Sequence, residues 1–431
     1  MILELKNIGK INQAKIELNG ITVIAGENNT GKSTIGKMLF CVFHTFYRIE
    51  EQIREERTKS IVRVLNGYYR ETMNRYTLRV NGIDLARDII DQQTTFLGDR
   101  ILLVKEIENY YASRDQNFQQ YIDQEELEKV ADKIFAFLKL KDIDIQKILL
   151  RKRLEAEFGM KVAHLNKVEQ NAYVKMKIKE NTIDFAVINN KDISITNYMN
   201  LNKEIIYMDD PFILDDLVKT HWLILPRQEF DHRQDLLQKM ANNQKNEEFS
   251  FVDEVIVQKK LEKILKVIQN VCDGSLVSDE TNRFVYKTDR LNGSLDMVNL
   301  STGMKNFIIL QQLLQNGNID ENGIIILDEP EIHLHPEWQL KFAEIIVLLQ
   351  KEFNMNILLN THSPYFLNAI EVYSEENEIN NKCKYYLIEE NNTVAEVLDV
   401  TNLTEKIYEK LAKPLQELEN LEYGNGMSGI I

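Results

Sequence analysis

The chain has 431 residues, 44% of them hydrophobic and 28% charged, which is typical of an ordinary globular protein with two or three domains. Its net charge of −15 argues against strong nucleic-acid binding by this chain alone, because proteins that bind nucleic acid usually carry a basic surface. The cysteines are widely separated without a CxxC pair, and no signal-like N-terminus or membrane-length apolar run occurs. We therefore expect a cytoplasmic protein with reduced thiols, without a zinc site or a membrane partner.

Residues 1–47 predict the N-terminal lobe of an α/β domain. Apolar and polar residues alternate in 2–5 and 14–18 around a turn, as in a β-hairpin. After Gly20, residues 21–25 form a largely apolar run that is typical of a strand buried on both faces. A glycine-rich loop follows, and from Ser33 onward apolar residues recur at helical intervals.

Residues 48–295 change in character and predict a large mixed helical and β insert, which we expect to include the remainder of the first lobe and a helical subdomain. No sustained heptad array is present, so the insert is not the long coiled-coil arm of a large SMC protein. The expected elements are helix-like stretches at 50–63, 125–157 and 255–271, alternating strands within 174–195, and short strands at 205–210 and 223–225.

Residues 296–400 predict the C-terminal lobe, and 401–431 a final helix and tail. We expect a helix over 303–315 with Gly317 just past its end, buried strands at 324–327 and 357–359, and a helix that begins at Pro336. Strands at 384–388 and 394–400 close the sheet, and a helix over 404–421 carries an apolar stripe of Ile407, Leu411, Leu415 and Leu418.

The loop after the first buried strand reads GENNTGKST and fits the P-loop pattern GxxxxGK[ST] in its proper place between a strand and a helix. The glycines allow backbone angles that other residues resist, so that the amides between them can cradle phosphates at a helix N-terminus. We expect Lys32 to contact the β- and γ-phosphates of ATP and Ser33 to bind Mg²⁺. The predicted ATP-binding residues here are Gly26, Asn28, Asn29, Thr30, Gly31, Lys32, Ser33 and Thr34; the alternative is a chance glycine-rich turn.

Two carboxylates end the second buried strand in the sequence GIIILDEPEIHLHP, residues 323–336. Open α/β sheets place ligand chemistry at the carboxyl ends of their strands. We expect Asp328 to belong to the Mg²⁺ shell and Glu329 to act as general base toward the attacking water. The alternative is an acidic surface turn.

The segment NLSTGMK, residues 299–305, precedes that strand and opens a helix, and this order resembles the signature and Walker B sequences of ABC-type ATPases. The resemblance implies an ABC-ATPase head that dimerises, with Ser301 and Gly303 contacting the γ-phosphate held by the opposite protomer. Lys305 stands where transporters usually have Gln. A plain helix capped by Ser301 or Thr302 is the alternative.

A histidine follows the third buried strand in NTHSPYFL, residues 360–367. By the same resemblance, His362 occupies the switch-histidine position and would hydrogen-bond the γ-phosphate as a catalytic residue. A purely structural histidine is the alternative.

The residues after the Walker B pair indicate the subfamily. The sequence from Pro330 to Pro336 is similar to that of OLD, SMC-like and related bacterial defence ATPases and differs from that of transporters. We expect His335 to cap the helix begun by Pro336 and His333 to lie at the dimer seam. Gln228 is our first candidate for the family's Q-loop glutamine, and Gln92 and Gln93 are others.

No nuclease signature is evident: the sequence has no HNH cluster, and too few residues follow His362 for a TOPRIM domain. The resemblance therefore points to a stand-alone Septu-type ATPase, with ATP and Mg²⁺ as cofactors. Its expected partners are a second copy or a higher homo-oligomer and a separate HNH or TOPRIM nuclease, with nucleic acid reached through the complex. The alternative function is an SMC-like DNA-repair or chromosome-maintenance head that clamps DNA itself; a transporter ATPase ranks third.

Overall fold

A computed structural model describes residues 1–73, 80–164, 170–217, 231–242, 251–280, 283–290, 292–391 and 393–426. The chain divides into two compact units, one formed by Met1–Tyr47 with Leu150–Ile431 and the other by Arg48–Leu149. The expected strand at 223–225 and the candidate Gln228 lie outside the described residues. Among the helices that are described, none is both long and apolar enough to cross a membrane.

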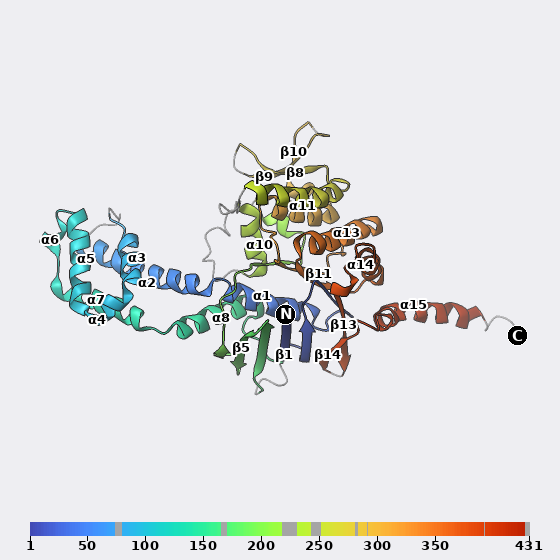
Figure 1. Ribbon diagram of the computed structural model, residues 1–431, viewed down its shortest axis with the longest axis horizontal. Helices are drawn as coiled ribbons and strands as arrows, with labels where there is room; N and C mark the ends of the chain where they lie inside the picture. Colours follow the sequence, from blue (N-terminus) through green and yellow to red (C-terminus); the bar gives the residue numbers. More distant parts are fainter. Residues whose placement is uncertain are drawn as a thin grey trace. The chain divides into compact units, whose positions relative to one another are not determined.

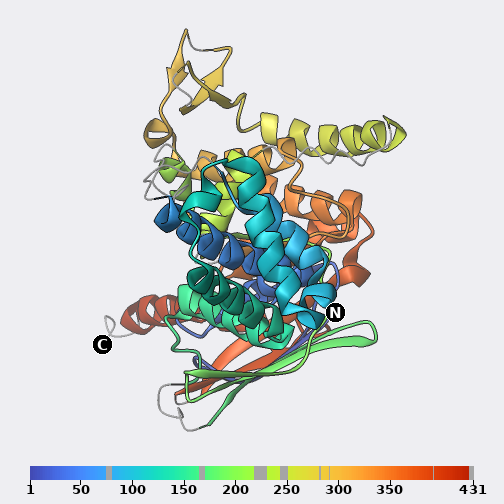
Figure 2. The same ribbon diagram turned by 90° about the vertical axis from the view of Figure 1, so that its left-hand side faces the viewer.

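The first unit is built on a mixed sheet (Figure 1), whose strands run in the order β6-β5-β4-β1-β2-β14-β13-β3-β12-β11-β7 within the described chain. Its antiparallel part holds the expected N-terminal hairpin and the strands expected within 174–195, and Figure 2 shows these strands as one curved layer. The bounds of this part are β1 (Ile2–Ile8), β2 (Ile11–Glu17), β4 (Ala172–Ile178), β5 (Asn181–Ile188) and β6 (Asp192–Asn197). Strand β14 (Val394–Asp399) joins it to the rest of the sheet, parallel to β2 and antiparallel to the strand on its other side.

The other part of the sheet is parallel and carries the expected buried strands. Its register pairs Ala25 with Thr361 and Asp328 with Asn360, so the carboxyl ends of three strands meet at one edge. The strands are apolar on both faces because helices cover both sides of a parallel sheet. Their bounds are β13 (Cys383–Asn391), β3 (Ile21–Gly26), β12 (Asn356–Thr361), β11 (Ile324–Asp328) and β7 (Ile205–Met208).

Helices flank this parallel part, and one large core cluster joins the strands to the helices from α9 (Ile213–Asp216) to α15 (Glu405–Gly426). Helix α12 ends as its sequence predicts, because Gly317 follows its C-cap with a φ of 73° and donates its N–H to the Leu314 carbonyl. Helix α13 begins at Pro336 and is capped by His335, also as predicted. Helix α8 (Asp142–Phe158) begins in the second unit and belongs to this one from Leu150 onward. The bounds of the other helices are α1 (Lys32–Phe46), α9 (Ile213–Asp216), α10 (His232–Ala241), α11 (Phe251–Gln269), α12 (Thr302–Gln315), α13 (Pro336–Phe353), α14 (Pro364–Glu376) and α15 (Glu405–Gly426).

A small antiparallel sheet follows α11 (Figure 1) and packs through β8 on α12. It consists of β8 (Gly274–Ser278), β9 (Phe284–Thr288) and β10 (Ser294–Leu295). The three cysteines, Cys41, Cys272 and Cys383, are free and buried.

The second unit is helical and has its own core, in which the rings of Tyr69 and Tyr111 stack at 5.1 Å. The helix-like stretch expected over 125–157 is two helices in the structure, separated after Lys139. The bounds in this unit are α2 (Ile49–Thr72), α3 (Ile83–Asp91), α4 (Gln93–Gly98), α5 (Arg100–Arg114), α6 (Phe118–Tyr121) and α7 (Gln124–Lys139).

Candidate active site

The loop between β3 and α1 has the backbone that its glycines predict. Gly31 adopts a left-handed φ of 107° at the start of α1, where a side chain would be strained. A Cβ atom on Gly26 would lie 2.8 Å from the carbonyl oxygen of Ile388, so no larger residue fits there without movement. Asn28, Asn29 and Ser33 are exposed along this loop, whereas Thr30 is buried and bonds to the carbonyl of Glu27.

Lys32 lies folded into the same loop and is only 4% exposed. Its Nζ atom donates to the carbonyl oxygens of Gly26 at 3.0 Å and Glu27 at 2.9 Å, and it lies 3.3 Å from Oε1 of Glu329. The ammonium group thus sits between the P-loop and the end of β11, where phosphate oxygens of a bound nucleotide could replace its backbone partners.

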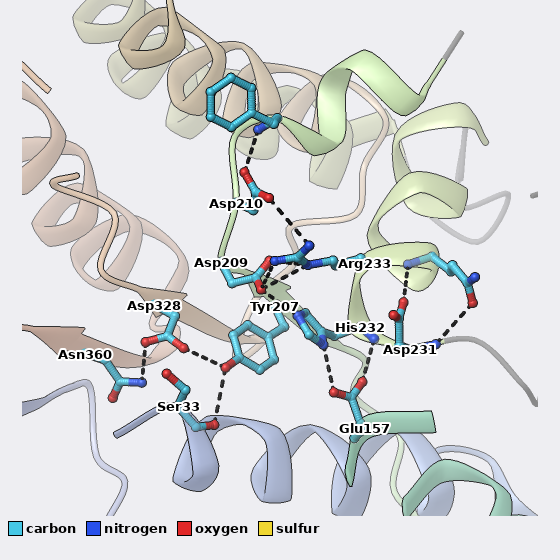
Figure 3. A network of polar contacts seen from close by, with 12 residues as sticks. Ser33, Glu157, Tyr207, Asp209, Asp210, Asp231, His232, Arg233, Asp328 and Asn360 are labelled. Carbon is cyan, nitrogen blue, oxygen red and sulfur yellow. Dashed lines mark hydrogen bonds and ion pairs between the residues drawn. The ribbon is translucent and has the colours of Figure 1, made fainter. Parts of the chain in front are cut away.

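Asp328 ends β11 as a buried carboxylate with a donor on each oxygen (Figure 3). The hydroxyl of Tyr207, on β7, donates to Oδ2 at 2.8 Å, and the side-chain amide of Asn360, on β12, donates to Oδ1 at 2.9 Å. The Tyr207 hydroxyl also lies 3.4 Å from the carbonyl oxygen of Ser33. The carboxylate is therefore held near the start of α1.

Glu329 follows with a left-handed φ of 51°, an uncommon conformation for a residue with a side chain. Its N–H donates to the carbonyl of Asn360 at 2.9 Å, which extends the β11–β12 pairing through this turn. Such backbone strain persists only when neighbouring contacts hold it, and it often occurs at functional sites.

Glu329 and His362 face each other at the ends of β11 and β12. Nδ1 of His362 lies 3.4 Å from Oε1 of Glu329, and contact with His362 and Lys32 lowers the pKa of the Glu329 carboxyl. The same contact with Glu329 raises the pKa of His362. The two side chains thus form a charge-stabilised pair, beside the lysine expected to bind phosphate.

Glu331 is a buried carboxyl next to this pair. It accepts hydrogen bonds from the Thr361 hydroxyl and from the backbone N–H of His362, so it fixes the loop that carries the histidine. Burial raises the pKa of Glu331. Our sequence analysis gave Glu331 no role.

The signature segment packs tightly on the loop after β11 of the same chain. A Cβ atom on Gly303 would lie 2.8 Å from the carbonyl oxygen of His333, and the side chain of Asn306 donates to the Pro330 carbonyl at 3.1 Å. Ser301 is exposed at the N-cap of α12, but its side chain makes no capping hydrogen bond. The hydroxyl of Ser301 is therefore not used for capping, in contrast to the plain capped helix considered as an alternative.

Lys305, also in the signature segment, is almost fully buried. Its Nζ atom forms an ion pair with both carboxylate oxygens of Asp215 at 2.6 and 2.8 Å and lies 5.1 Å from the centre of the Phe212 ring. Residues 206–217 read IYMDDPFILDDL and are rich in aspartate; through Asp215 this acidic stretch is a structural partner of α12.

A second polar cluster lies behind Tyr207 (Figure 3). The ring of His232 stacks on the Tyr207 ring at 4.3 Å, with Nδ1 bonded to Glu157 at 2.8 Å and Nε2 lying 3.0 Å from Asp209. Burial alone would lower the pKa of His232, but the two carboxylates raise it to about 9. The imidazole is therefore a buried cation at neutral pH.

The predicted site residues of the P-loop, of the β11 end and of the β12 end are brought together in this unit. Neither His333 nor His335 contributes to a metal cluster, since no such group of His, Cys, Asp or Glu occurs in the described parts of the chain. Gln93 was one of the other candidates for the Q-loop glutamine. Its side-chain amide donates to the Leu138 carbonyl at 2.8 Å, within the helical unit. Sequence analysis missed Tyr207 and Asn360, although it had placed Tyr207 on a short strand and Asn360 at the start of the histidine segment.

The oxygen donors at this site fit Mg²⁺, because this ion binds through one or two carboxylates, hydroxyls and phosphate oxygens rather than through a protein cage. The Tyr207 hydroxyl contacts both Asp328 and the backbone of Ser33, which brings the two expected metal-binding residues to the same place.

Comparisons with known proteins agree with these observations. The profile of the family described as AAA ATPase domain matches residues 1–367. The chain is 32% identical over 163 residues to the "Retron Vc95 probable ATPase" of Vibrio cholerae serotype O1 biovar El Tor, covering 35% of this chain and 30% of that protein. It is 32% identical over 143 residues to the "Septu protein PtuA" of Bacillus thuringiensis, covering 29% of this chain and 35% of that protein. The matches thus span about a third of each relative's length.

Among solved structures, the SMC head domain from Thermotoga maritima aligns over 93% of this chain and 98% of that one, with a TM-score of 0.39 and 10% identity. This likeness is too distant to add to the conclusions drawn from the residues.

The family match and the named retron and Septu relatives confirm the resemblance to this group of ATPases, and the mixed sheet around the P-loop confirms the expected α/β fold class. The chain therefore belongs to the AAA ATPase domain family.

Proposed function

We propose that this ATPase closes as a homodimer over ATP and that closure regulates a separate effector nuclease in bacterial anti-phage defence. The arrangement of Lys32, Glu329 and His362 within hydrogen-bonding or ion-pairing range is the main observation behind the proposal. The names of the retron and Septu relatives support the defence role.

Within each protomer, the residues have separate tasks. The backbone of residues 26–34 binds the phosphates, and Lys32 neutralises the β- and γ-phosphates. Ser33 and Asp328 would hold Mg²⁺, and the bound ion would supply positive charge to offset the negative charge of the phosphate oxygens. Glu329 accepts the proton of the attacking water, and His362 donates a hydrogen bond to the γ-phosphate.

The second protomer completes the site through its signature segment. The Ser301 hydroxyl has no capping role within its own chain, and it lies at the positive end of the α12 dipole. Contact with the γ-phosphate would therefore favour the closed dimer, and hydrolysis would remove that contact. ATP acts as a switch, and the output is the activity of a partner.

Mixed dimers test the two-protomer site. Lys32→Ala and Ser301→Arg should each be inactive alone, because one removes the phosphate-binding cation and the other fills the opposing site with bulk and charge. In a mixed dimer, one composite site carries both lesions and the other carries neither. We expect hydrolysis to recover partly, up to about half of the wild-type rate per mixed dimer.

The control for this experiment is a mixture of Lys32→Ala with Glu329→Gln. Lys32 and Glu329 are 3.3 Å apart in one protomer, so every site in that mixed dimer keeps one lesion and no recovery is expected. Recovery in neither mixture would show that the site is built within a single protomer, or that the chain does not dimerise.

The effector role has its own test. The purified chain alone is expected to leave DNA intact in the presence of ATP and Mg²⁺, and cleavage should require the product of a neighbouring nuclease gene. Cleavage by the chain alone that persists in Lys32→Ala would contradict this role. ATP-dependent retention of DNA without any nuclease would favour the DNA-clamping alternative.

A further inference from the structure

We propose that Tyr207 is a positioning residue for the Mg²⁺ site: its hydroxyl fixes the Asp328 carboxylate in the orientation needed for the metal shell. The inference deepens the proposed function and rests on the proposed role of Asp328 in holding Mg²⁺.

The first argument is the way in which Asp328 is bonded (Figure 3). Tyr207 donates to one carboxylate oxygen at 2.8 Å and Asn360 to the other at 2.9 Å. Two donors from neighbouring strands on opposite sides define the plane of the carboxylate, while further lone pairs stay available on each oxygen. Partners of this kind orient metal ligands and tune their affinity.

The second argument is that the donors are neutral. A lysine or arginine in place of Tyr207 would offset the negative charge of Asp328 and weaken its attraction for a cation. A tyrosine hydroxyl carries its own proton and no charge, and that of Tyr207 donates to Asp328 at 2.8 Å. A neutral phenol thus orients the carboxylate and leaves its charge for the metal.

The third argument is that Tyr207 itself is held on several sides. Its ring stacks on His232 at 4.3 Å, and the Phe40 ring lies at 6.3 Å. On the side of α1, a Cβ atom at Gly36 would lie 3.0 Å from the tyrosine hydroxyl, so the glycine leaves room for it. The hydroxyl therefore has one well-defined position.

The fourth argument concerns the residue beneath the tyrosine. His232 is 3% exposed and is bonded to Glu157 through both its backbone N–H at 2.6 Å and Nδ1 at 2.8 Å. Asp209, the second residue after Tyr207, lies on the opposite ring nitrogen, and Arg233 donates to the same carboxylate. The cationic ring is thereby locked against the face of Tyr207, an arrangement that favours contact between a cation and an aromatic ring.

The experiment is a Mg²⁺ titration of the binding of a labelled, non-hydrolysable ATP analogue. Tyr207→Phe removes only the hydroxyl and should raise the Mg²⁺ concentration at half-effect by roughly 10–100-fold. Binding of the analogue in EDTA should change little. Asp328→Asn should shift the same midpoint, and the double variant should shift it no further than Asp328→Asn alone, because Tyr207 acts through Asp328.

Tyr386→Phe is the matched control. Tyr386 is also buried on a strand of this sheet, β13, but its hydroxyl accepts the backbone N–H of Glu17, away from the site. The midpoint of the Mg²⁺ titration in Tyr386→Phe should equal that of the wild type. A thermal melt of each variant verifies folding.

Two results would overturn the inference. If Tyr207→Phe keeps the wild-type midpoint while Asp328→Asn shifts it, the tyrosine does not position the carboxylate, although the metal role of Asp328 stands. If Asp328→Asn also keeps the midpoint, the metal role of Asp328 fails and the inference fails with it. Equal, additive shifts in the double variant would likewise indicate that Tyr207 acts independently of Asp328.

Discussion

The ammonium nitrogen of Lys32 and the carboxylate of Glu329 lie 3.3 Å apart, one at the start of α1 and the other just after β11. The same lysine is bonded to the carbonyls of Gly26 and Glu27, so a nucleotide phosphate has to compete with three oxygen partners for it. The residue expected to bind phosphate and the residue expected to activate water therefore share one electrostatic environment.

Lys32→Ala should abolish nucleotide binding, because the substitution removes the buried cation facing the β- and γ-phosphates. Fluorescence titration with a labelled ATP analogue measures this directly. Lys37→Ala, farther along α1, is the control and should bind normally. An affinity close to wild type in Lys32→Ala would contradict the P-loop interpretation.

Glu329→Gln should bind ATP with near-normal affinity but hydrolyse it about 10²–10⁴-fold more slowly, because the general base is lost while the phosphate contacts remain. The variant should also accumulate as a closed dimer in the presence of ATP. Single-turnover kinetics measure the hydrolysis rate, and size-exclusion chromatography with ATP measures the dimer. Glu337→Gln, exposed at the start of α13, should behave as wild type. A normal hydrolysis rate in Glu329→Gln would place the base elsewhere.

Gly303→Ala should impair hydrolysis and lower stability by roughly 1–3 kcal/mol, since the added methyl group would press against the His333 carbonyl and displace the signature segment. Gly67→Ala is the matched control within helix α2: nothing lies within 4 Å of its added Cβ atom, and a gain of about 0.5–1 kcal/mol is expected. Urea denaturation and ATPase assays check both variants. Full activity in Gly303→Ala would show that the segment tolerates displacement.

The sequence predicted the elements that depend on local patterns. The P-loop, the apolar strand before Asp328 and the cap of α13 by His335 are each encoded by a few adjacent residues. Tyr207 and Asn360 could not be identified in this way, because their contact with Asp328 depends on the pairing of β7 and β12 with β11. The contact of Glu157 with His232 likewise joins residues that are remote in sequence.

The apolar stripe of the last helix illustrates another limit. Ile407 is buried and Leu411 packs against the core, but Leu418 is 59% exposed. Regular spacing predicts that these residues lie on one face of the helix. It does not show that the core covers only the beginning of that face, around Ile407 and Leu411.

Leu411→Asp should therefore lower stability by about 1–3 kcal/mol, because it buries a charge against the core. Leu418→Asp should leave stability unchanged, since this side chain is exposed. Thermal melts distinguish the two, and co-purification with a partner shows whether the exposed end of α15 is a docking site. Unchanged melting of Leu411→Asp would contradict its packing on the core.

Stability should depend on pH through His232. Its pKa is about 9 in the folded chain and about 6.5 when unperturbed, so its contribution is fully present below pH 6.5 and is lost as the pH rises through 9. The contribution amounts to about 3 kcal/mol. Urea denaturation at several pH values measures the free energy of unfolding. As the pH rises through 9, this free energy should fall less in His232→Gln than in the wild type. Equal slopes for both proteins would mean that this histidine is not a cation in the folded state.

The order of strands in the sheet has a consequence for synthesis of the protein. In the sheet, β3 lies between β12 and β13, which follow it much later in the chain. On the ribosome, the P-loop strand is therefore made long before the strands that hydrogen-bond to it, and it has no partner in the parallel sheet until Asn356 and the residues after it have emerged. Nascent chains should expose an apolar strand for most of translation and depend on chaperones. ATP hydrolysis should accordingly appear only once β12 and His362 have been made.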